Sequence, residues 1–240
     1  MTVVALGSVK GSPGVTTVVL ALASVWPAER RVLVAEADPD GGVLAVRREL
    51  GLEPGLGTLA AAVRRGSDAA AAHTQALGEG VRAIVAPPSA EQTRAAVSVA
   101  GDRLWRALDA MPGDVLVDCG RLTTTSPVLA VTLQAAITLV VTRPRLEDVA
   151  LLRERIPALR REGADPHILL CGGGPYQRDE VAATVEAPVI ASIPHDRRTA
   201  DALDSRSPRG VSPRSPLIRG ARTLSTALIR RVATGSEAPE

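Results

Sequence analysis

Aromatic residues are almost absent from this chain of 240 residues, which holds two tryptophans, one tyrosine and no phenylalanine. Recognition of single-stranded nucleic acid depends on aromatic rings that stack on bases, so this scarcity argues against that class of protein. Lysine is equally scarce, since Lys10 is the only lysine among 28 cationic residues. The net charge is +2, without a block of like charges, so it neither requires nor excludes binding to double-stranded DNA.

Long apolar runs and closely spaced cysteines are missing as well. The longest apolar stretches, around Val18–Ala23 and Ala135–Val141, are far shorter than the roughly 18 to 20 residues that cross a bilayer. The first residues form a strand-like run, Val3–Leu6, instead of a secretory signal, so we expect a cytoplasmic protein. Cys119 and Cys171 lie in separate apolar runs, a placement typical of buried thiols in a reducing compartment.

What the sequence does hold is a regular alternation of strand-like and helical segments. Apolar, β-branched runs predict strands at Val3–Ser8, Val32–Ala37, Val81–Ala86, Val115–Cys119, Ile137–Thr142, Ile168–Cys171 and Val189–Ile193. Helical spacing predicts helices at Thr16–Val25, Glu91–Ala110, Leu146–Arg161 and Leu217–Val232. The alternation predicts an α/β fold: a single-domain, doubly wound, mostly parallel sheet with helices on both faces, spanning 1–233, with a disordered tail at 234–240.

Two segments of biased composition interrupt this alternation. The alanine-rich segment Ala60–Ala76 predicts a pair of surface helices broken at Gly66. Proline, serine and arginine crowd Ser205–Ser215, which predicts a loop before the last helix.

A loop of small residues lies between the first predicted strand and the first predicted helix. It consists of Lys10, Gly11, Ser12, Pro13, Gly14, Val15, Thr16 and Thr17. Small residues at such a junction let backbone N–H groups converge above the helix N-terminus, which forms a cradle for phosphate. An ordinary tight turn is the alternative interpretation.

This loop resembles the deviant Walker A loop of the ParA/MinD superfamily of P-loop ATPases, whose usual form is Lys-Gly-Gly-x-Gly-Lys-Thr-Thr. The matching positions are Lys10, at the family's signature lysine, Gly11, Gly14, Thr16 and Thr17. Ser12 replaces the second glycine, and Val15 replaces the lysine that in the family contacts the β- and γ-phosphates. An isopropyl group offers neither a charge nor a hydrogen-bond donor to a phosphate.

Further segments are similar to other motifs of the same family. After the second predicted strand, Asp38 holds the place of the second aspartate of an Asp-x-Asp-Pro segment, which orients the attacking water. Asp118 ends a strand that looks like Walker B, whose aspartate supports Mg²⁺. Val189–Asp196 is similar to the last-strand segment, in which the proline, here Pro194, lies against adenine. Gly172 and Gly173 stand where many members carry a base-reading asparagine.

The resemblance implies a domain that binds ATP or ADP with Mg²⁺. The residues it assigns are Lys10 and Asp38 to catalysis, Thr16 and Asp118 to the metal, and Gly11, Ser12, Pro13, Gly14, Val15, Thr16, Thr17 and Pro194 to the nucleotide. Because Val15 removes an ammonium that stabilises charge on the transferred phosphate, we expect nucleotide binding to be weak or absent and ATP hydrolysis to be weak or lost. The chain then resembles degenerate, TadZ/CpaE-like positioning proteins, which act through protein partners as a homodimer or as a heterodimer with another ATPase.

Two other functions within this fold stay open. An active partition ATPase that dimerises and binds DNA would need Lys10 or one of Arg121, Arg143 and Arg145 to supply the missing charge. The second open function is that of a metabolic enzyme with this fold, such as dethiobiotin synthetase or the nitrogenase iron protein. The iron protein needs a pair of cysteines at a dimer-facing cluster, whereas Cys119 lies inside the segment that resembles Walker B.

The last predicted helix carries a single apolar stripe, formed by Leu217, Ile218, Ala221, Leu224, Leu228 and Val232. One stripe is typical of a helix packed on its own sheet. MinD-like members bind the bilayer through a further amphipathic helix, but the segment at 235–240 is acidic and has no second stripe. We therefore expect no intrinsic membrane binding.

Overall fold

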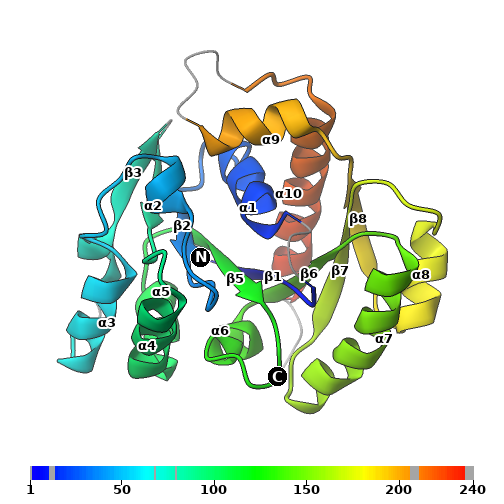
Figure 1. Ribbon diagram of the computed structural model, residues 1–240. Helices are drawn as coiled ribbons and strands as arrows, with labels where there is room; N and C mark the ends of the chain where they lie inside the picture. The colour runs from blue at the N-terminus through cyan, green and yellow to red at the C-terminus, as the bar shows by residue number, and fades with distance from the viewer. Residues whose placement is uncertain (1, 11–13, 68, 79, 206–210, 236–240) are drawn as a thin grey trace.

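The computed structural model describes residues 2–10, 14–67, 69–78, 80–205 and 211–235. Its centre is an eight-stranded sheet of order β3-β4-β2-β5-β1-β6-β7-β8 (Figure 1). The strands are β1 (Val3–Ser8), β2 (Val32–Glu36), β3 (Gln75–Gly78), β4 (Val81–Ile84), β5 (Asp114–Arg121), β6 (Ile137–Thr142), β7 (Pro166–Cys171) and β8 (Val189–Ile193). The edge strand β3 runs antiparallel to β4, and the other neighbouring pairs are parallel.

Helices connect the parallel strands. They are α1 (Val15–Ser24), α2 (Leu44–Arg47), α3 (Leu56–Arg64), α4 (Ala90–Ala100), α5 (Asp102–Asp109), α6 (Leu129–Gln134), α7 (Leu146–Arg161), α8 (Arg178–Val185), α9 (Arg197–Asp204) and α10 (Pro216–Gly235), with a 3-10 turn η1 (Ala70–His73). The predicted α/β fold, with a doubly wound, mostly parallel sheet and helices on both faces, is confirmed.

Successive side chains of β1 point to opposite faces of the sheet, and both faces are covered. Val3 and Ala5 pack in a core shared with helices α3 to α8. Val4 and Leu6 pack in a second core shared with α1, α2, α9 and α10. Figure 1 shows α3 to α8 on one side of the sheet and α1, α9 and α10 on the other. Because neither face meets water, the central strands have continuous apolar sequences rather than alternating ones.

The predicted strands are all present. Those at Val3–Ser8, Ile137–Thr142 and Val189–Ile193 are confirmed at these bounds, and the ends of the other four differ by one or two residues. The helix at Leu146–Arg161 is also confirmed, whereas the one at Glu91–Ala110 is divided into α4 and α5 at Gly101.

The pair of surface helices predicted for Ala60–Ala76 is wrong. Helix α3 begins earlier, at Leu56, and buries Leu59 and Val63 against the sheet. Between Gly66 and Gly78, the described residues form the turn η1 and the edge strand β3 and no second helix of the predicted pair. Strand β3 exists because its backbone pairs with β4, and alanine-rich local sequence carries no sign of that pairing.

The C-terminal helix follows the predicted packing but extends further. Its apolar stripe is buried in the second core at Leu217, Ile218, Ala221, Leu224 and Leu228. Helix α10 continues to Gly235, two residues beyond the expected domain end at 233, and the rest of the expected tail lies outside the described residues. Among the helices described, none has both the length and the apolar character needed to span a membrane.

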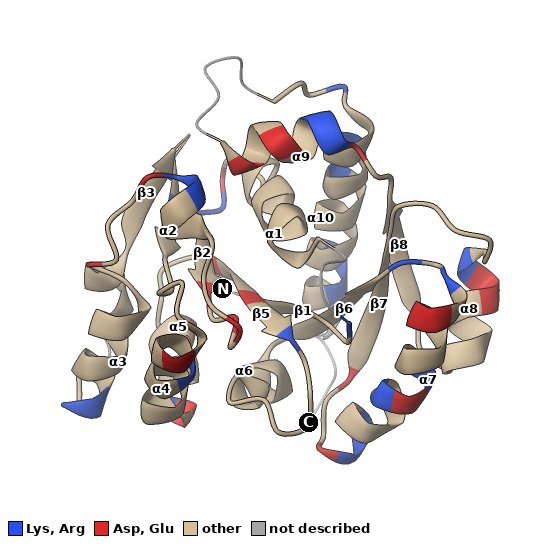
Figure 2. Cartoon of the chain, in the orientation of Figure 1, with Lys and Arg blue, Asp and Glu red and all other residues tan. Residues whose placement is uncertain are grey.

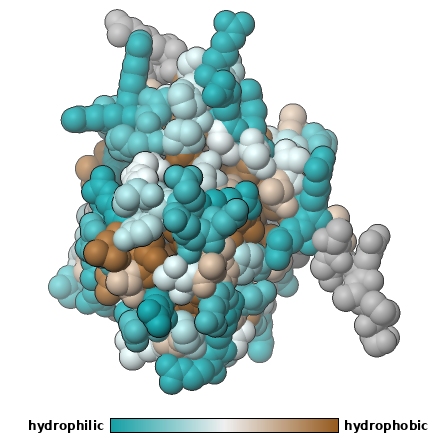
Figure 3. Space-filling model, turned by 90° about the vertical axis from the view of Figure 1, so that its right-hand side faces the viewer, coloured by the Kyte–Doolittle hydropathy of each residue, from teal (hydrophilic) through white to brown (hydrophobic). Residues whose placement is uncertain are grey.

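Large apolar side chains at the surface are scattered over several elements. Examples are Val46 on α2, which is 68% exposed, and Leu146 at the start of α7, which is 66% exposed. Figure 3 views the molecule from its α7 and α8 side, where hydrophilic residues cover most of the surface and apolar ones form small patches. Such a distribution of single exposed apolar side chains is ordinary for a globular domain.

Candidate functional site

Two adjoining clefts lie near the carboxyl ends of the parallel strands, where ligands bind in open α/β sheets. The first, called here the central cleft, has a volume of about 470 Å³ and is lined by Ser8, Gly14, Val15, Thr16, Thr17, Glu36, Asp38, Asp40, Gly41, Val43, Arg47, Asp118, Gly120 and Arg121. The second, the lateral cleft, has a volume of about 500 Å³. Gly14 and Thr17 line both, so the two clefts meet at the start of α1.

The start of α1 presents a hydroxyl to the central cleft. Gly14 precedes the helix with φ +98°, a left-handed conformation that favours glycine. Val15 is buried in the second core, although it also borders the cleft. The hydroxyl of Thr16 donates a hydrogen bond of 2.6 Å to Asp118 Oδ2, which joins α1 to β5.

Asp118 is only 1% exposed, and burial raises the pKa of its carboxyl from 3.8 to about 7. Hydrogen bonds from Thr16 and from the backbone N–H of Gly120, 3.0 Å from Oδ1, act in the opposite direction. The nearby carboxylates of Glu36 and Asp38 raise the pKa further. The cleft thus gathers three acidic groups in a poorly hydrated place, which a divalent cation would stabilise in their charged forms.

The oxygen donors of Thr16 and Asp118 fit Mg²⁺, which prefers hard oxygen ligands. Within the described ranges, no group of three or more His, Cys, Asp and Glu side chains is placed to hold a metal ion. Magnesium commonly takes one or two protein ligands and completes its shell with phosphate oxygens and water. The donor set therefore suits a metal that arrives with a polyphosphate.

Glu36 is a cleft residue that the sequence did not single out. Its carboxylate accepts backbone hydrogen bonds from Val43 at 2.6 Å, Leu44 at 3.0 Å and Ala86 at 2.9 Å. Burial raises the pKa of Glu36 in spite of these bonds. The side chain ties the start of α2 and the end of β4 to β2. In the sequence Glu36 opens the segment that resembles Asp-x-Asp-Pro, but no role was assigned to it.

Asp38 lies in the central cleft because Gly120 leaves room for it. A Cβ atom at Gly120 would overlap the carboxylate of Asp38, and Gly120 has φ +57°. Oδ1 of Asp38 accepts the backbone N–H of Asp40 at 2.9 Å. Burial raises the pKa of Asp38, while Arg121 and Arg94 lower it. The carboxylate of Asp38 can thus lie near Asp118 because β5 has no side chain at Gly120.

We expect Gly120→Ala to lower the free energy of unfolding by about 2 to 4 kcal/mol, because it adds backbone strain and displaces Asp38. Gly163→Ala is the matched control, since Gly163 also has positive φ, at +99°, but its Cβ would meet nothing within 4 Å. The control should lose only about 1 to 2 kcal/mol of backbone strain. Urea unfolding measures both losses, and equal losses would contradict the steric role of Gly120.

Lys10 forms an intramolecular ion pair. Its Nζ lies 3.9 Å from Asp148 Oδ1, and its side chain is 44% exposed. The buried carboxylate of Asp148, at the start of α7, also accepts a hydrogen bond of 2.8 Å from Nε of Arg143. Lys10 and Arg143 therefore share one carboxylate.

The lateral cleft is lined by Pro194, the residue that the resemblance assigns to a nucleotide base. Other lining residues are Arg143, Arg145, Cys171, Gly172, Gly173, His195 and Asp196. Asp196 is engaged in capping α9, since Oδ1 accepts the backbone N–H of Thr199 at 3.1 Å and Oδ2 accepts its hydroxyl at 2.7 Å. Gly172 and Gly173 themselves contribute no side chain that could read a base.

The fold brings most of the predicted site residues together. Those in the central cleft are Gly14, Val15, Thr16, Thr17, Asp38 and Asp118, and Pro194 is in the lateral cleft. Lys10 lines neither of these two clefts. Gly11, Ser12 and Pro13 lie outside the described residues. The functional roles of all these residues stay predictions.

No protein-family model and no curated protein sequence matches this chain. Solved structures do: a ParA family ATPase from Chlorobium tepidum TLS is 17% identical, with 94% of this chain and 98% of that chain covered and a TM-score of 0.77. The septum site-determining protein MinD of Pyrococcus horikoshii OT3, complexed with Mg-ADP, is 17% identical over 100% and 99% of the two chains, with a TM-score of 0.75. An ATP complex of McdA from Cyanothece is 16% identical over 100% and 98%, with a TM-score of 0.68. At such identities the likeness shows the fold.

Proposed function

We propose, from a fold shared with ParA and MinD ATPases, that this chain binds ATP or ADP with Mg²⁺ in the central cleft and hydrolyses ATP weakly or not at all. Its role is that of a positioning or regulatory scaffold that acts through protein partners, as a homodimer or as a heterodimer with another ATPase. The observation that carries the proposal is the hydrogen bond between Thr16 and Asp118, placed directly after the turn at Gly14.

The proposal has two parts, nucleotide binding and weak hydrolysis. The first rests on metal ligands that the cleft contains, and the second on a lysine that is absent at position 15. Thr16 and Asp118 would hold Mg²⁺, which when bound neutralises charge on the β- and γ-phosphates. Asp38, half-buried beside Asp118, is the residue we assign to orienting water. At Val15 the loop offers no ammonium, and Lys10 lies beside Asp148 instead. The cleft therefore contains the two oxygen ligands that we propose for Mg²⁺. The charge that develops on the transferred phosphate, however, is stabilised incompletely.

Binding to DNA as an active partition ATPase is the alternative function, and the surface supports it less well. In Figure 2 cationic and acidic residues are interspersed along α7, α8 and α9. Arg197, one of the exposed arginines, lies 3.8 Å from Asp201 on the same helix. Binding to duplex DNA depends on a concentration of positive charge, which mixed charges reduce.

Titration of the full chain with Mg-ATP and Mg-ADP in a calorimeter tests the proposal. We expect micromolar or weaker binding, because a lost charge-assisted contact reduces affinity about tenfold or more. Thr16→Ala should weaken binding further, and Thr223→Ala, an exposed threonine on α10, should not. Mass measurement with and without nucleotide reports dimer formation. Nanomolar affinity, or no binding of either nucleotide, would refute the proposal.

A further inference from the structure

The central cleft has Val15 where the resembled loop motif carries a lysine, so we ask which other side chain of this chain could give positive charge to a polyphosphate there. Lys10 and Arg143 share the buried carboxylate of Asp148. Arg145 lines the lateral cleft. Among the described residues, the arginines that line the central cleft together with the metal-binding pair proposed above are Arg47 and Arg121.

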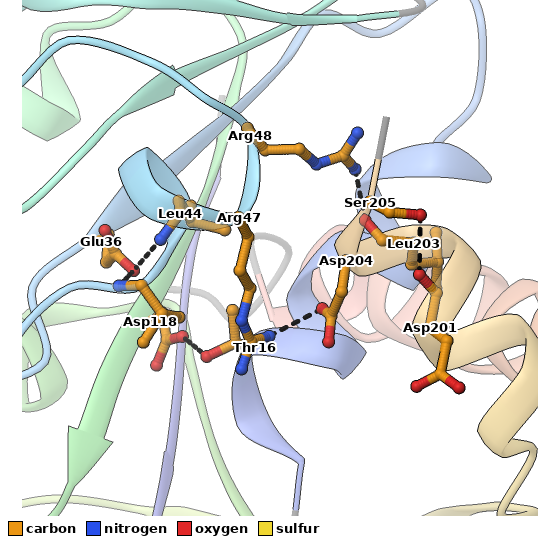
Figure 4. Close-up of polar contacts among 11 residues, drawn as sticks. Thr16, Glu36, Leu44, Arg47, Arg48, Asp118, Asp201, Leu203, Asp204 and Ser205 are labelled. Atoms are coloured by element: carbon orange, nitrogen blue, oxygen red, sulfur yellow. Dashed lines mark hydrogen bonds and ion pairs between the residues drawn. The ribbon is translucent and has the colours of Figure 1, made fainter. Parts of the chain in front are cut away.

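Arg47 is the last residue of α2, and it reaches across the cleft to α9. Its Nη1 lies 2.7 Å from Asp204 Oδ1, with side chains that are 35% and 29% exposed. The neighbouring Arg48 donates a hydrogen bond of 2.5 Å from Nη2 to the backbone oxygen of Leu203. Figure 4 shows both contacts, which join α2 to the C-terminal end of α9.

The backbone that carries Arg47 is held firmly beside the metal-binding pair. Glu36 accepts the N–H groups of Val43 and Leu44 at the start of α2, and Leu44 is fully buried. In the sheet, Glu36 is the register partner of Asp118. A change in the partner of Arg47 therefore requires only rotation of its side chain and leaves α2 in place.

We infer that Arg47 supplies the positive charge to a polyphosphate in the central cleft, in place of the lysine absent at position 15, and that Asp204 holds its guanidinium until the polyphosphate binds. This inference rests on the proposed function. A partly exposed ion pair contributes little stability, so exchanging it is easy. A guanidinium binds phosphate through two parallel hydrogen bonds. This contact is stronger than the partly exposed ion pair with Asp204 that it would replace.

Arg121 is the competing cation, and its surroundings differ. It follows Gly120 directly, is exposed, and lies close enough to Asp38 to lower the pKa of that carboxyl. Its charge is thus directed at the acidic wall of the cleft. Arg47, in contrast, is paired with Asp204 on α9. A polyphosphate can therefore replace Asp204 as the partner of Arg47 without drawing a cation away from Asp38.

Calorimetric titration of the full chain with Mg-ATP tests the inference. Arg47→Ala should weaken binding about 10- to 100-fold, and Arg47→Lys should restore part of it because it keeps a charge. Asp204→Asn should strengthen binding about two- to fivefold, because it frees Arg47. Arg121→Ala should have less effect than Arg47→Ala. Arg197→Ala is the matched control, since it removes an arginine of an ion pair on α9 away from the cleft.

The outcomes separate this inference from the proposed function. If the wild type binds Mg-ATP and Arg47→Ala binds equally well, Arg47 is not the phosphate-binding cation and the proposed function stands. A larger loss in Arg121→Ala than in Arg47→Ala would overturn the assignment in favour of Arg121. Unchanged affinity in Asp204→Asn would refute the role given to Asp204, and this variant carries the test if Arg47→Ala does not fold. A wild type that binds no nucleotide removes both.

Discussion

Asp118→Asn is expected to stabilise the nucleotide-free protein at pH 8 by about 1 to 3 kcal/mol, although it removes a carboxylate that we assign to metal binding. In the folded chain burial raises the pKa of Asp118 from 3.8 to about 7, so folding favours its protonated form. Below about pH 3 the carboxyl is mostly protonated in both the folded and unfolded states and contributes little difference. Between pH 4 and 7 the unfolded chain loses its proton first, and the wild type therefore loses stability as the pH rises.

Asparagine is neutral throughout this range, which removes that pH-dependent loss. It can accept a hydrogen bond from Thr16 or from Gly120 with its one oxygen, so the variant gives up about 1 kcal/mol of hydrogen bonding at every pH. At pH 5 this cost roughly offsets the smaller pH-dependent loss of the wild type, so the two proteins should be about equally stable there. Urea unfolding at pH 5 and pH 8 measures both effects. The variant should also lose the Mg²⁺-dependent part of its ATP affinity. A variant less stable than the wild type at both pH values would contradict the prediction.

Asp114→Asn is the matched contrast. Asp114 is also a buried carboxylate, but it forms an ion pair with Arg30, whereas the hydrogen-bond donors to Asp118 are neutral. Burial opposes its ionisation, but hydrogen bonds from Arg30 and Trp26 outweigh this effect and lower its pKa. The stabilisation is complete above the unfolded-state pKa and is lost as the pH falls below it. At pH 8 this variant should lose about 1 to 3 kcal/mol, the opposite sign to Asp118→Asn. Equal signs would mean that the two environments do not differ as described.

Val15→Lys is expected to increase the affinity for Mg-ATP tenfold or more, since it restores a charge-assisted contact to phosphate. The side chain borders the central cleft, so a lysine can direct its ammonium there. Val15 is 7% exposed and packs in the second core, and replacing it should lower the free energy of unfolding by about 1 to 2 kcal/mol. Residual ATP hydrolysis should rise as well, because the ammonium stabilises charge on the transferred phosphate.

Val15→Met is the control, because methionine has a similar length and carries no charge. Calorimetric titration and phosphate release, measured on both variants and the wild type, separate charge from size. Equal affinity of the lysine and methionine variants would show that the cleft no longer places a phosphate near position 15.

The sequence by itself determined the fold class, and it indicated part of the candidate site. Buried strands such as Val3–Ser8 require apolar, β-branched residues on both faces, and that demand is visible in neighbouring residues. Thr16 and Asp118 were singled out because the loop before α1 and the strand β5 resemble two motifs of one family, and the fold brings the two side chains into hydrogen-bond contact. The strand and loop patterns are short-range features, in which the chain's local order sets the geometry.

The tertiary structure alone decided which distant groups meet. Arg47 and Asp204 are 157 residues apart, and their pairing depends on α2 and α9 lying across one cleft. The placement of Lys10 beside Asp148 depends in the same way on where α7 begins relative to β1. Strand β3 was missed because its hydrogen bonds come from β4 rather than from its own side chains. Such contacts arise when the sheet and its helices pack together, and local periodicity records only which residues are buried, not which partners they find.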